Sequence, residues 1–131
     1  PEAPTPTPAP TPLREPAIIP ERPVQIGGTG ELDACRHAGK VANLDPQGDN
    51  FLALRAAPNE AAEEKDRLTA GATVYMCERL RNGAWIGIVY EAGGSLGAGC
   101  GVASPIDQRQ NYAGICRSGW VSGQYIQLVA G

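Results

Sequence analysis

The sequence predicts an all-β domain, built as a small barrel or sandwich of five or six short strands. Short runs rich in Val, Ile, Leu, Tyr and Trp recur along residues 41–129, and turns rich in Gly and Pro separate them. This spacing is typical of small all-β folds. No segment shows the apolar periodicity of a long helix. The 131 residues suffice for one such domain and a tail.

The central unit is a hairpin in residues 73–91. Asn82-Gly83 lies between its two arms, and Asn-Gly is a strong signal for a tight turn because both residues tolerate positive φ. Alternating residues of the second arm point to opposite faces, one of them toward the core. The inward residues of this arm are Ile86, Ile88 and Tyr90, and the outward ones are Trp85, Gly87 and Val89.

Four further strands flank this hairpin, with a turn at residues 45–49. Residues 61–67 are charged, which favours one helical turn or an exposed loop. The four strands are residues 41–44, 51–55, 118–122 and 125–129. The predicted core consists of Leu52, Leu54, Leu68, Val74, Met76, Ile86, Ile88, Val121 and Ile126.

The N-terminal residues form a linker. Residues 1–23 hold nine of the twelve prolines, and such a segment favours extended polyproline II rather than a packed core. We therefore assign residues 1–30 to a disordered Pro/Thr-rich linker, with a flexible joint at residues 24–30, and residues 31–131 to the domain. Residues 31–35 fit one helical turn. The linker acts as a spacer or, alternatively, as a ligand for a proline-binding domain.

Composition limits the possible functions. The net charge of −3 does not suit nucleic-acid binding, which needs a basic patch. No apolar run approaches the roughly 20 residues that span a bilayer. Because the chain starts at Pro1 rather than Met, we interpret it as a mature or trimmed product, attached to a membrane only through a missing N-terminal anchor. We expect a monomer.

The four cysteines predict two disulfides. An even number of cysteines in a small chain suggests an oxidising compartment, and therefore an exported protein of the periplasm or cell surface. Cys100 and Cys116 flank one Gly-rich segment, so we pair them and leave Cys35 with Cys77. Four reduced, buried thiols are the alternative.

Residues 92–117 differ from the rest of the domain. They contain many glycines and few large apolar residues, and a structureless loop of this length is uncommon unless it is functional or tied down. A Cys100–Cys116 disulfide would tie it down. We treat residues 92–117 as an insertion into the β domain.

Three segments together resemble the bacterial SH3-like (SH3b) domain: FLALRAAPN, RLTAGATVYMCERLRNGAWIGIVY and SGWVSGQYIQL. The resemblance covers residues 41–129, and GWVSGQYI is its most specific part. It departs from the family pattern at Ala57, where Gly is usual, and at the insertion of residues 92–117. It implies a five-stranded SH3-type barrel. It also implies a non-catalytic module of the cell envelope that binds peptidoglycan or its peptides, or that targets a neighbouring domain.

The sequence offers little for catalysis. His37 lies two residues from Cys35, but this candidate nucleophile–base pair precedes the barrel, lacks a third orienting group and fails if Cys35 forms a disulfide. The cysteines and the histidine lack the usual spacing of zinc ligands. No phosphate-binding loop follows a strand. We therefore expect neither an enzyme nor a metal or other cofactor.

Binding has better support, from aromatic residues and the insertion. Large aromatics are favoured at recognition sites, although each of these residues alternatively only covers the small barrel. The expected ligand is a cell-wall peptide or glycan; the alternative is an adaptor or structural role with an envelope protein as partner. The candidate binding residues are Trp85, Arg109, Tyr112, Trp120 and Tyr125.

Overall fold

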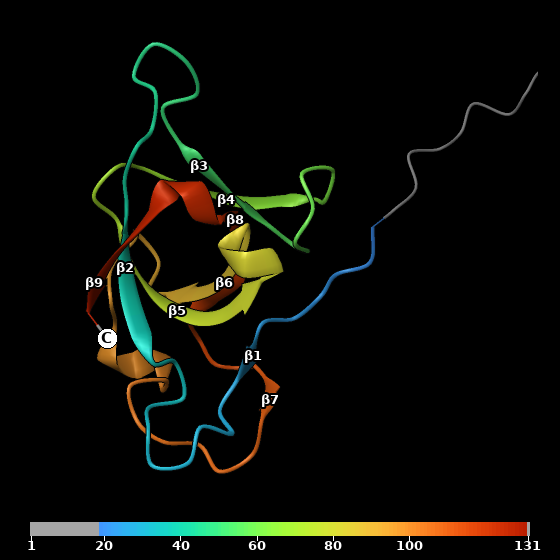
Figure 1. Cartoon of the computed structure of the whole chain (residues 1–131), viewed down its shortest axis with the longest axis vertical. Coiled ribbons are helices and arrows are strands. Elements are labelled where there is room, and N and C mark those ends of the chain that lie inside the picture. Colours follow the sequence, from blue (N-terminus) through green and yellow to red (C-terminus); the bar gives the residue numbers. More distant parts are fainter. Residues whose placement is uncertain (1–18, 131) are drawn as a thin grey trace, which may run out of the picture.

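The computed structural model describes residues 19–130, which form an all-β fold, as predicted (Figure 1). Nine strands and three short 3-10 turns are present in these residues. The strands are β1 (Gln25–Ile26), β2 (His37–Val41), β3 (Leu52–Arg55), β4 (Glu64–Leu68), β5 (Thr73–Leu80), β6 (Trp85–Tyr90), β7 (Gln110–Asn111), β8 (Arg117–Ser122) and β9 (Ile126–Ala130), and the 3-10 turns are η1 (Arg81–Gly83), η2 (Ala98–Cys100) and η3 (Gly123–Tyr125).

Seven of the strands form one antiparallel sheet in the order β4-β3-β8-β6-β5-β2-β9. Figure 1 shows this sheet curving around the interior of the domain. Its first and last strands do not pair with each other within residues 19–130, so the sheet is open rather than a closed barrel. The prediction of five or six strands was therefore too low. A separate two-stranded sheet pairs β1 with β7.

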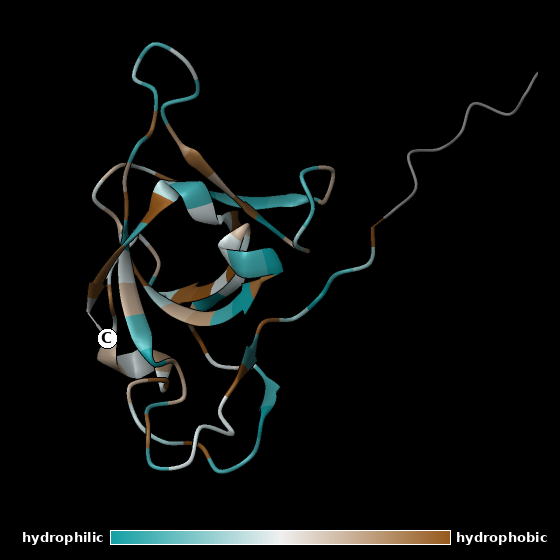
Figure 2. Ribbon diagram, viewed as in Figure 1, coloured by the Kyte–Doolittle hydropathy of each residue, from teal (hydrophilic) through white to brown (hydrophobic). Residues whose placement is uncertain are grey.

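The additional strands carry weak sequence signals. The predicted strand at residues 41–44 lies earlier, as β2, and residues 42–50 form a loop instead. The charged residues 61–67 contribute β4, which pairs with β3 and is hydrophilic in Figure 2. Charged residues on an edge strand discourage pairing with other chains. Only Leu68 of β4 is buried, so the strand lacks the apolar alternation that prediction relies on.

The central hairpin is present as β5 and β6, and it contains a bulge. Asn82 and Gly83 have positive φ values of 57° and 90°, as their sequence suggested. The pairing register shifts between Met76 and Glu78. A bulge adds an unpaired residue to one strand. The side chains of Cys77 and Glu78 can therefore both contact the N-terminal segment and the insertion on the outer side of the sheet.

The predicted core is confirmed. One apolar cluster fills the concave side of the large sheet, and the sequence-predicted residues all belong to it or pack against it. Its predicted members are Leu52, Leu54, Leu68, Val74, Ile86, Ile88 and Val121, which are buried, and Met76 and Ile126, which are partly buried.

Truncating the centre of this core should be costly. Ile88 is fully buried, and it pairs with Met76 on β5 and with Gly119 on β8. We expect Ile88→Ala to lower the free energy of unfolding by about 2–4 kcal/mol, because it leaves a cavity among rigid strands. Urea denaturation measures the change. An unchanged midpoint would show that this residue does not face the core.

The outer side of the hairpin is buried as well, which the sequence did not predict. Val89 has no exposed surface and belongs to a second apolar cluster with Ile26, Cys35, Cys100 and Val102. The residues of this cluster come from three separate parts of the chain: the N-terminal segment, the hairpin and the insertion. The insertion and the N-terminal segment therefore form a second layer over β5 and β6.

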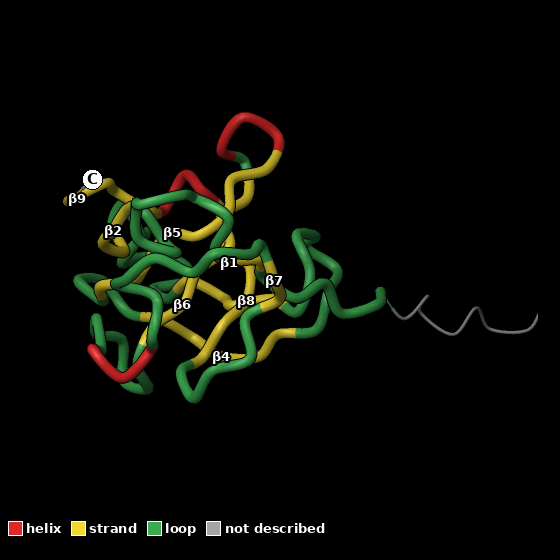
Figure 3. The backbone as a smooth tube through the Cα atoms, turned by 90° about the horizontal axis from the view of Figure 1, so that it is seen from below, coloured by secondary structure: helices red, strands yellow, loops and turns green. Residues whose placement is uncertain are grey.

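The predicted linker boundary at residue 30 is incorrect. Val24 and Ile26 are almost completely buried, and residues 25–26 pair with the insertion as β1 and β7 (Figures 1 and 3). Residues 24–30 thus pack on the domain instead of forming a flexible joint, and residues 31–35 form turns and bends rather than a helical turn. The predicted disorder of the proline-rich tail falls on residues 1–18, outside the described residues.

Candidate functional site

Both predicted disulfides are confirmed. Cys35 is bonded to Cys77 and Cys100 to Cys116, with sequence separations of 42 and 16. The first joins the N-terminal segment to the bulge of β5, and the second closes the insertion. Two disulfides are compatible with an oxidising, exported compartment.

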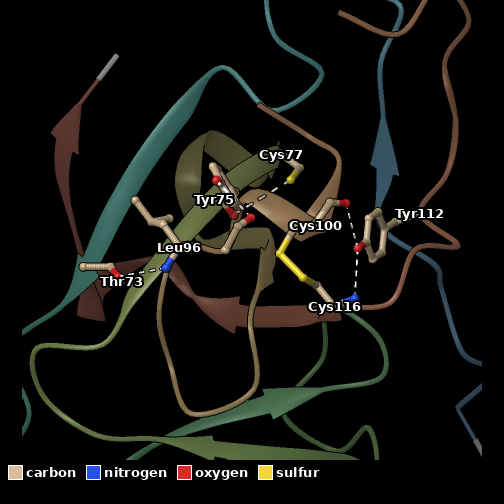
Figure 4. The surroundings of a disulfide bond; sticks show 8 residues. Thr73, Tyr75, Cys77, Leu96, Cys100, Tyr112 and Cys116 are labelled. Atoms are coloured by element: carbon tan, nitrogen blue, oxygen red, sulfur yellow. Dashed lines mark hydrogen bonds between the residues drawn. A yellow bond between two sulfur atoms is a disulfide. The ribbon is translucent and has the colours of Figure 1, made fainter. Parts of the chain in front are cut away.

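Tyr112 is occupied in holding the insertion together (Figure 4). Its hydroxyl donates a hydrogen bond to the Cys100 carbonyl at 3.0 Å and accepts one from the Cys116 backbone N–H at 3.1 Å. The phenol therefore bridges the two halves of the disulfide-closed loop. Its ring packs against the second apolar cluster, so this predicted binding residue has a structural role.

Arg109 is likewise engaged within the protein. Its guanidinium lies 3.1 Å from the Glu78 carboxylate, whose side chain is only 2% exposed, and it donates to the Gln25 side chain at 2.7 Å. The other oxygen of Glu78 accepts the Gln25 backbone N–H. A buried carboxylate needs such partners, because an isolated one is costly to desolvate. Arg109 thus joins the insertion to β1 and β5.

Trp120 is fully buried, in contrast to the exposed position expected of a binding residue. Its indole N–H donates to the Arg22 carbonyl at 2.7 Å, and the Arg22 guanidinium lies 5.4 Å from the ring centroid. The Arg22 backbone N–H in turn donates to the Ala56 carbonyl at 2.9 Å. The chain's own N-terminal segment therefore covers this tryptophan.

Trp85 and Tyr125 lie together on a surface cleft of about 630 Å³. The cleft lies between the loop after β2, strand β3, the start of β6 and the turn η3. Both aromatics are partly exposed, unlike Trp120. Hereafter the Trp85 cleft denotes the space lined by Asn43, Leu44, Asp45, Asp49, Phe51, Leu52, Ala53, Arg55, Glu60, Glu64, Trp85, Ser122, Gln124 and Tyr125.

The Trp85 cleft is acidic. Its lining includes four carboxylates but only one guanidinium, that of Arg55. Glu64 pairs with Arg67 at 2.6 Å, and Arg55 donates to a backbone carbonyl. Within residues 19–130, Asp45, Asp49 and Glu60 form no ion pair. One oxygen of Asp45 accepts the Gln47 backbone N–H at 2.8 Å. No cation within residues 19–130 neutralises these three carboxylates, so the cleft would attract a cationic group.

A second hollow of about 570 Å³ adjoins the cleft. The two hollows share Glu60, Trp85, Ser122 and Gln124. Arg81 lines only the second hollow, and its guanidinium also donates to the Pro58 carbonyl at 3.0 Å. A ligand that filled both hollows would contact Trp85, the carboxylates of the cleft and Arg81.

The five predicted binding residues therefore do not form one site. The structure brings Trp85 and Tyr125 together, whereas Arg109, Tyr112 and Trp120 hold the second layer in place. The carboxylates of the cleft were missed, because residues 45–49 were interpreted only as a turn and residues 61–67 only as a helical turn or an exposed loop. Two groups of acidic residues, Asp45 and Asp49 and then Glu60 and Glu64, were the available signal, but only the fold shows that they converge.

The remaining candidates for chemistry do not form a site. Cys35 is oxidised to a disulfide, so it cannot act as a nucleophile with His37. Nowhere in residues 19–130 do three His, Cys, Asp or Glu side chains lie close enough to hold a metal ion. Burial raises the pKa of Tyr90, and its hydrogen bond to Asp66 at 2.6 Å raises it further, which keeps this core hydroxyl protonated.

Comparisons with protein-family models, with curated proteins and with solved structures found no match. The resemblance to bacterial SH3-like domains thus depends on the sequence segments alone and stays a prediction. No helix in residues 19–130 is long and apolar enough to cross a bilayer.

Proposed function

We propose that this protein is an exported, non-catalytic binding module of the bacterial cell envelope, and that the Trp85 cleft binds an extended peptide carrying a cationic group. The observation that carries the proposal is the position of Trp85 and Tyr125 in a cleft where three carboxylates form no ion pair within residues 19–130. Peptides of the cell wall are the ligand class that the resemblance to bacterial SH3-like domains implies. The periplasm or the cell surface is the proposed location.

An SH3-type architecture is part of this proposal. The signature segment GWVSGQYI spans the end of β8, the turn η3 and the start of β9, which is a strand, a 3-10 turn and a strand. The same segment supplies Ser122, Gln124 and Tyr125 to the cleft. The part of the sequence that most resembles the family therefore coincides with the candidate site.

The chemistry of the cleft suits a peptide. Aromatic side chains offer contact area at low entropic cost and stack on flat or ring-shaped groups. Asp45 and Asp49 would attract an amine or guanidinium, and Arg81 would attract a carboxylate in the adjoining hollow. Trp85 lines both hollows, and its ring face also favours a nearby cation.

An adaptor role in an envelope complex is the alternative, and one observation favours it. Strand β9 lies at the edge of the large sheet, where Leu128 is 57% and Val129 50% exposed. Exposed apolar residues on an edge strand are suited to pairing with a partner strand. In that case variants of β9, not of the Trp85 cleft, would abolish partner binding.

The proposal predicts that Trp85→Ala and the double variant Asp45→Asn/Asp49→Asn bind purified peptidoglycan sacculi at least about 5-fold more weakly than the parent, as hot-spot residues do. Trp85 is only partly buried, so the fold should survive its truncation, and circular dichroism checks this. Asp33→Asn is the matched control, because it removes one exposed carboxylate outside the cleft. Unchanged retention of both cleft variants would contradict the proposal.

A further inference from the structure

The domain already binds one proline-rich piece of its own chain. Residues 20–23, Pro-Glu-Arg-Pro, form neither helix nor strand, and Arg22 lies beside Ala56, which follows β3. Arg22 donates its backbone N–H to Ala56 at 2.9 Å and accepts the indole N–H of Trp120 at 2.7 Å. The acceptor of this indole hydrogen bond is a backbone carbonyl, so the bond does not depend on the side chain of the bound residue. Other proline-rich residues of this chain could therefore accept a hydrogen bond from an aromatic N–H in the same way.

The Trp85 cleft has the features that recognise such a segment a second time. Grooves lined by aromatic residues bind proline-rich chains, because the polyproline II conformation is already ordered and little entropy is lost. Phe51, Trp85 and Tyr125 supply three aromatic rings in one cleft. The acidic residues Asp45 and Asp49 beside them require a cation in the bound segment.

We propose that residues 1–18 of this same chain occupy the Trp85 cleft, so that the module is covered by its own N-terminal segment until a competing peptide displaces it. This inference rests on the proposed peptide-binding function of the cleft. Six prolines lie in residues 1–12, and Arg14 is the one Lys or Arg in residues 1–18, which also contain Glu2 and Glu15. The proline run would lie across Trp85, with Arg14 toward Asp45 and Asp49.

The position of residue 19 permits this contact. Residues 21 and 22 lie against β3 and β4, where Lys65 and Ala56 contact them. The same two strands supply Arg55 and Glu64 to the cleft. Eighteen residues of polyproline II reach roughly 56 Å, which is ample for returning around the edge strand β4. A short tether also gives an effective concentration in the millimolar range, so a weak contact would be well populated.

Binding of a peptide to a shortened chain and to the full chain tests the inference. The chain of residues 19–131 retains both apolar clusters, both disulfides and the cleft, so it is the receptor for a synthetic peptide of residues 1–18. We expect this peptide to bind the shortened chain and to bind the full chain at least about 10-fold more weakly, since the tethered segment competes. Arg14→Glu in the peptide and Trp85→Ala in the receptor should each abolish binding.

Further outcomes separate this inference from the proposed function. Stronger retention of the shortened chain than of the full chain on sacculi would support both. Equal retention of the two, without binding of the peptide, would overturn self-occupancy and leave the wall-binding function standing. Peptide binding without any retention on sacculi would support self-occupancy and contradict the wall ligand. A concentration-dependent dimer of the full chain, lost in the shortened one, would overturn the intramolecular assignment.

Discussion

Replacing Trp120 by Ala is expected to lower the free energy of unfolding by about 3–5 kcal/mol, as for other buried aromatics. The side chain has no exposed surface and lies between β8 and the N-terminal segment. Its removal leaves a cavity, and it deprives the Arg22 carbonyl of its donor. The N-terminal segment, which holds Val24 and Ile26 in the second layer, should then detach at lower denaturant concentration.

Two matched variants separate the parts of this effect. Trp120→Phe keeps most of the ring but removes the N–H, so it should cost less, with about 1 kcal/mol from the lost hydrogen bond. Trp85→Ala removes the same side chain from a partly exposed position, so its stability loss should be much smaller. Urea denaturation measures all three. Equal losses for Trp85→Ala and Trp120→Ala would show that Trp120 is not the buried one.

The large sheet and its core could be predicted from the sequence because their signals are local. Alternating apolar residues and the Asn82-Gly83 turn establish the hairpin within residues 73–91. The alternation also places Ile86, Ile88 and Tyr90 on one face, which we interpreted as the inward one and which the core confirms. The proline-rich composition also located the tail, but it did not show that the chain begins to pack on the domain before residue 30.

The second layer could not be predicted, because it depends on contacts between distant residues. Val24 covers Gly87, and Arg109 reaches Glu78, with nothing in either local sequence to indicate the partner. Without this layer, Val89 appears to be a solvent-facing residue of a two-sided strand. The same lack of long-range information made Trp120 a candidate binding residue, although the N-terminal segment covers it.

The candidate cleft was predicted in part, through Trp85 and Tyr125, which occupy the start of β6 and the end of η3. Its carboxylates come from two separate parts of the sequence that are neighbours in space, and Glu64 begins strand β4. Asp45 and Asp49 belong to the loop after β2, and Glu60 to the loop before β4. The insertion, which the sequence suggested as the ligand surface, instead packs on the outer side of the hairpin.

Removing both disulfides is expected to have the largest effect of all. In the chain-entropy model, loops of 42 and 16 residues correspond to about 4 and 3 kcal/mol of stabilisation. Their combined loss is comparable with the whole stability of a small domain, roughly 5–15 kcal/mol. The variant with all four cysteines replaced by Ser should therefore be largely unfolded at 37 °C, as judged by near-ultraviolet circular dichroism.

The two bridges should not contribute equally. Cys35→Ser/Cys77→Ser opens the longer loop and also releases the N-terminal segment from β5, so it should lower the melting temperature more than Cys100→Ser/Cys116→Ser. In the variant that lacks the second disulfide, the Tyr112 hydroxyl can still bond to the backbone carbonyl of residue 100 and the backbone N–H of residue 116. These hydrogen bonds should partly keep the loop closed. Adding Tyr112→Phe to this variant should therefore destabilise the insertion further. The opposite order of melting temperatures would mean that the insertion, not the N-terminal segment, is what holds the second layer on the sheet.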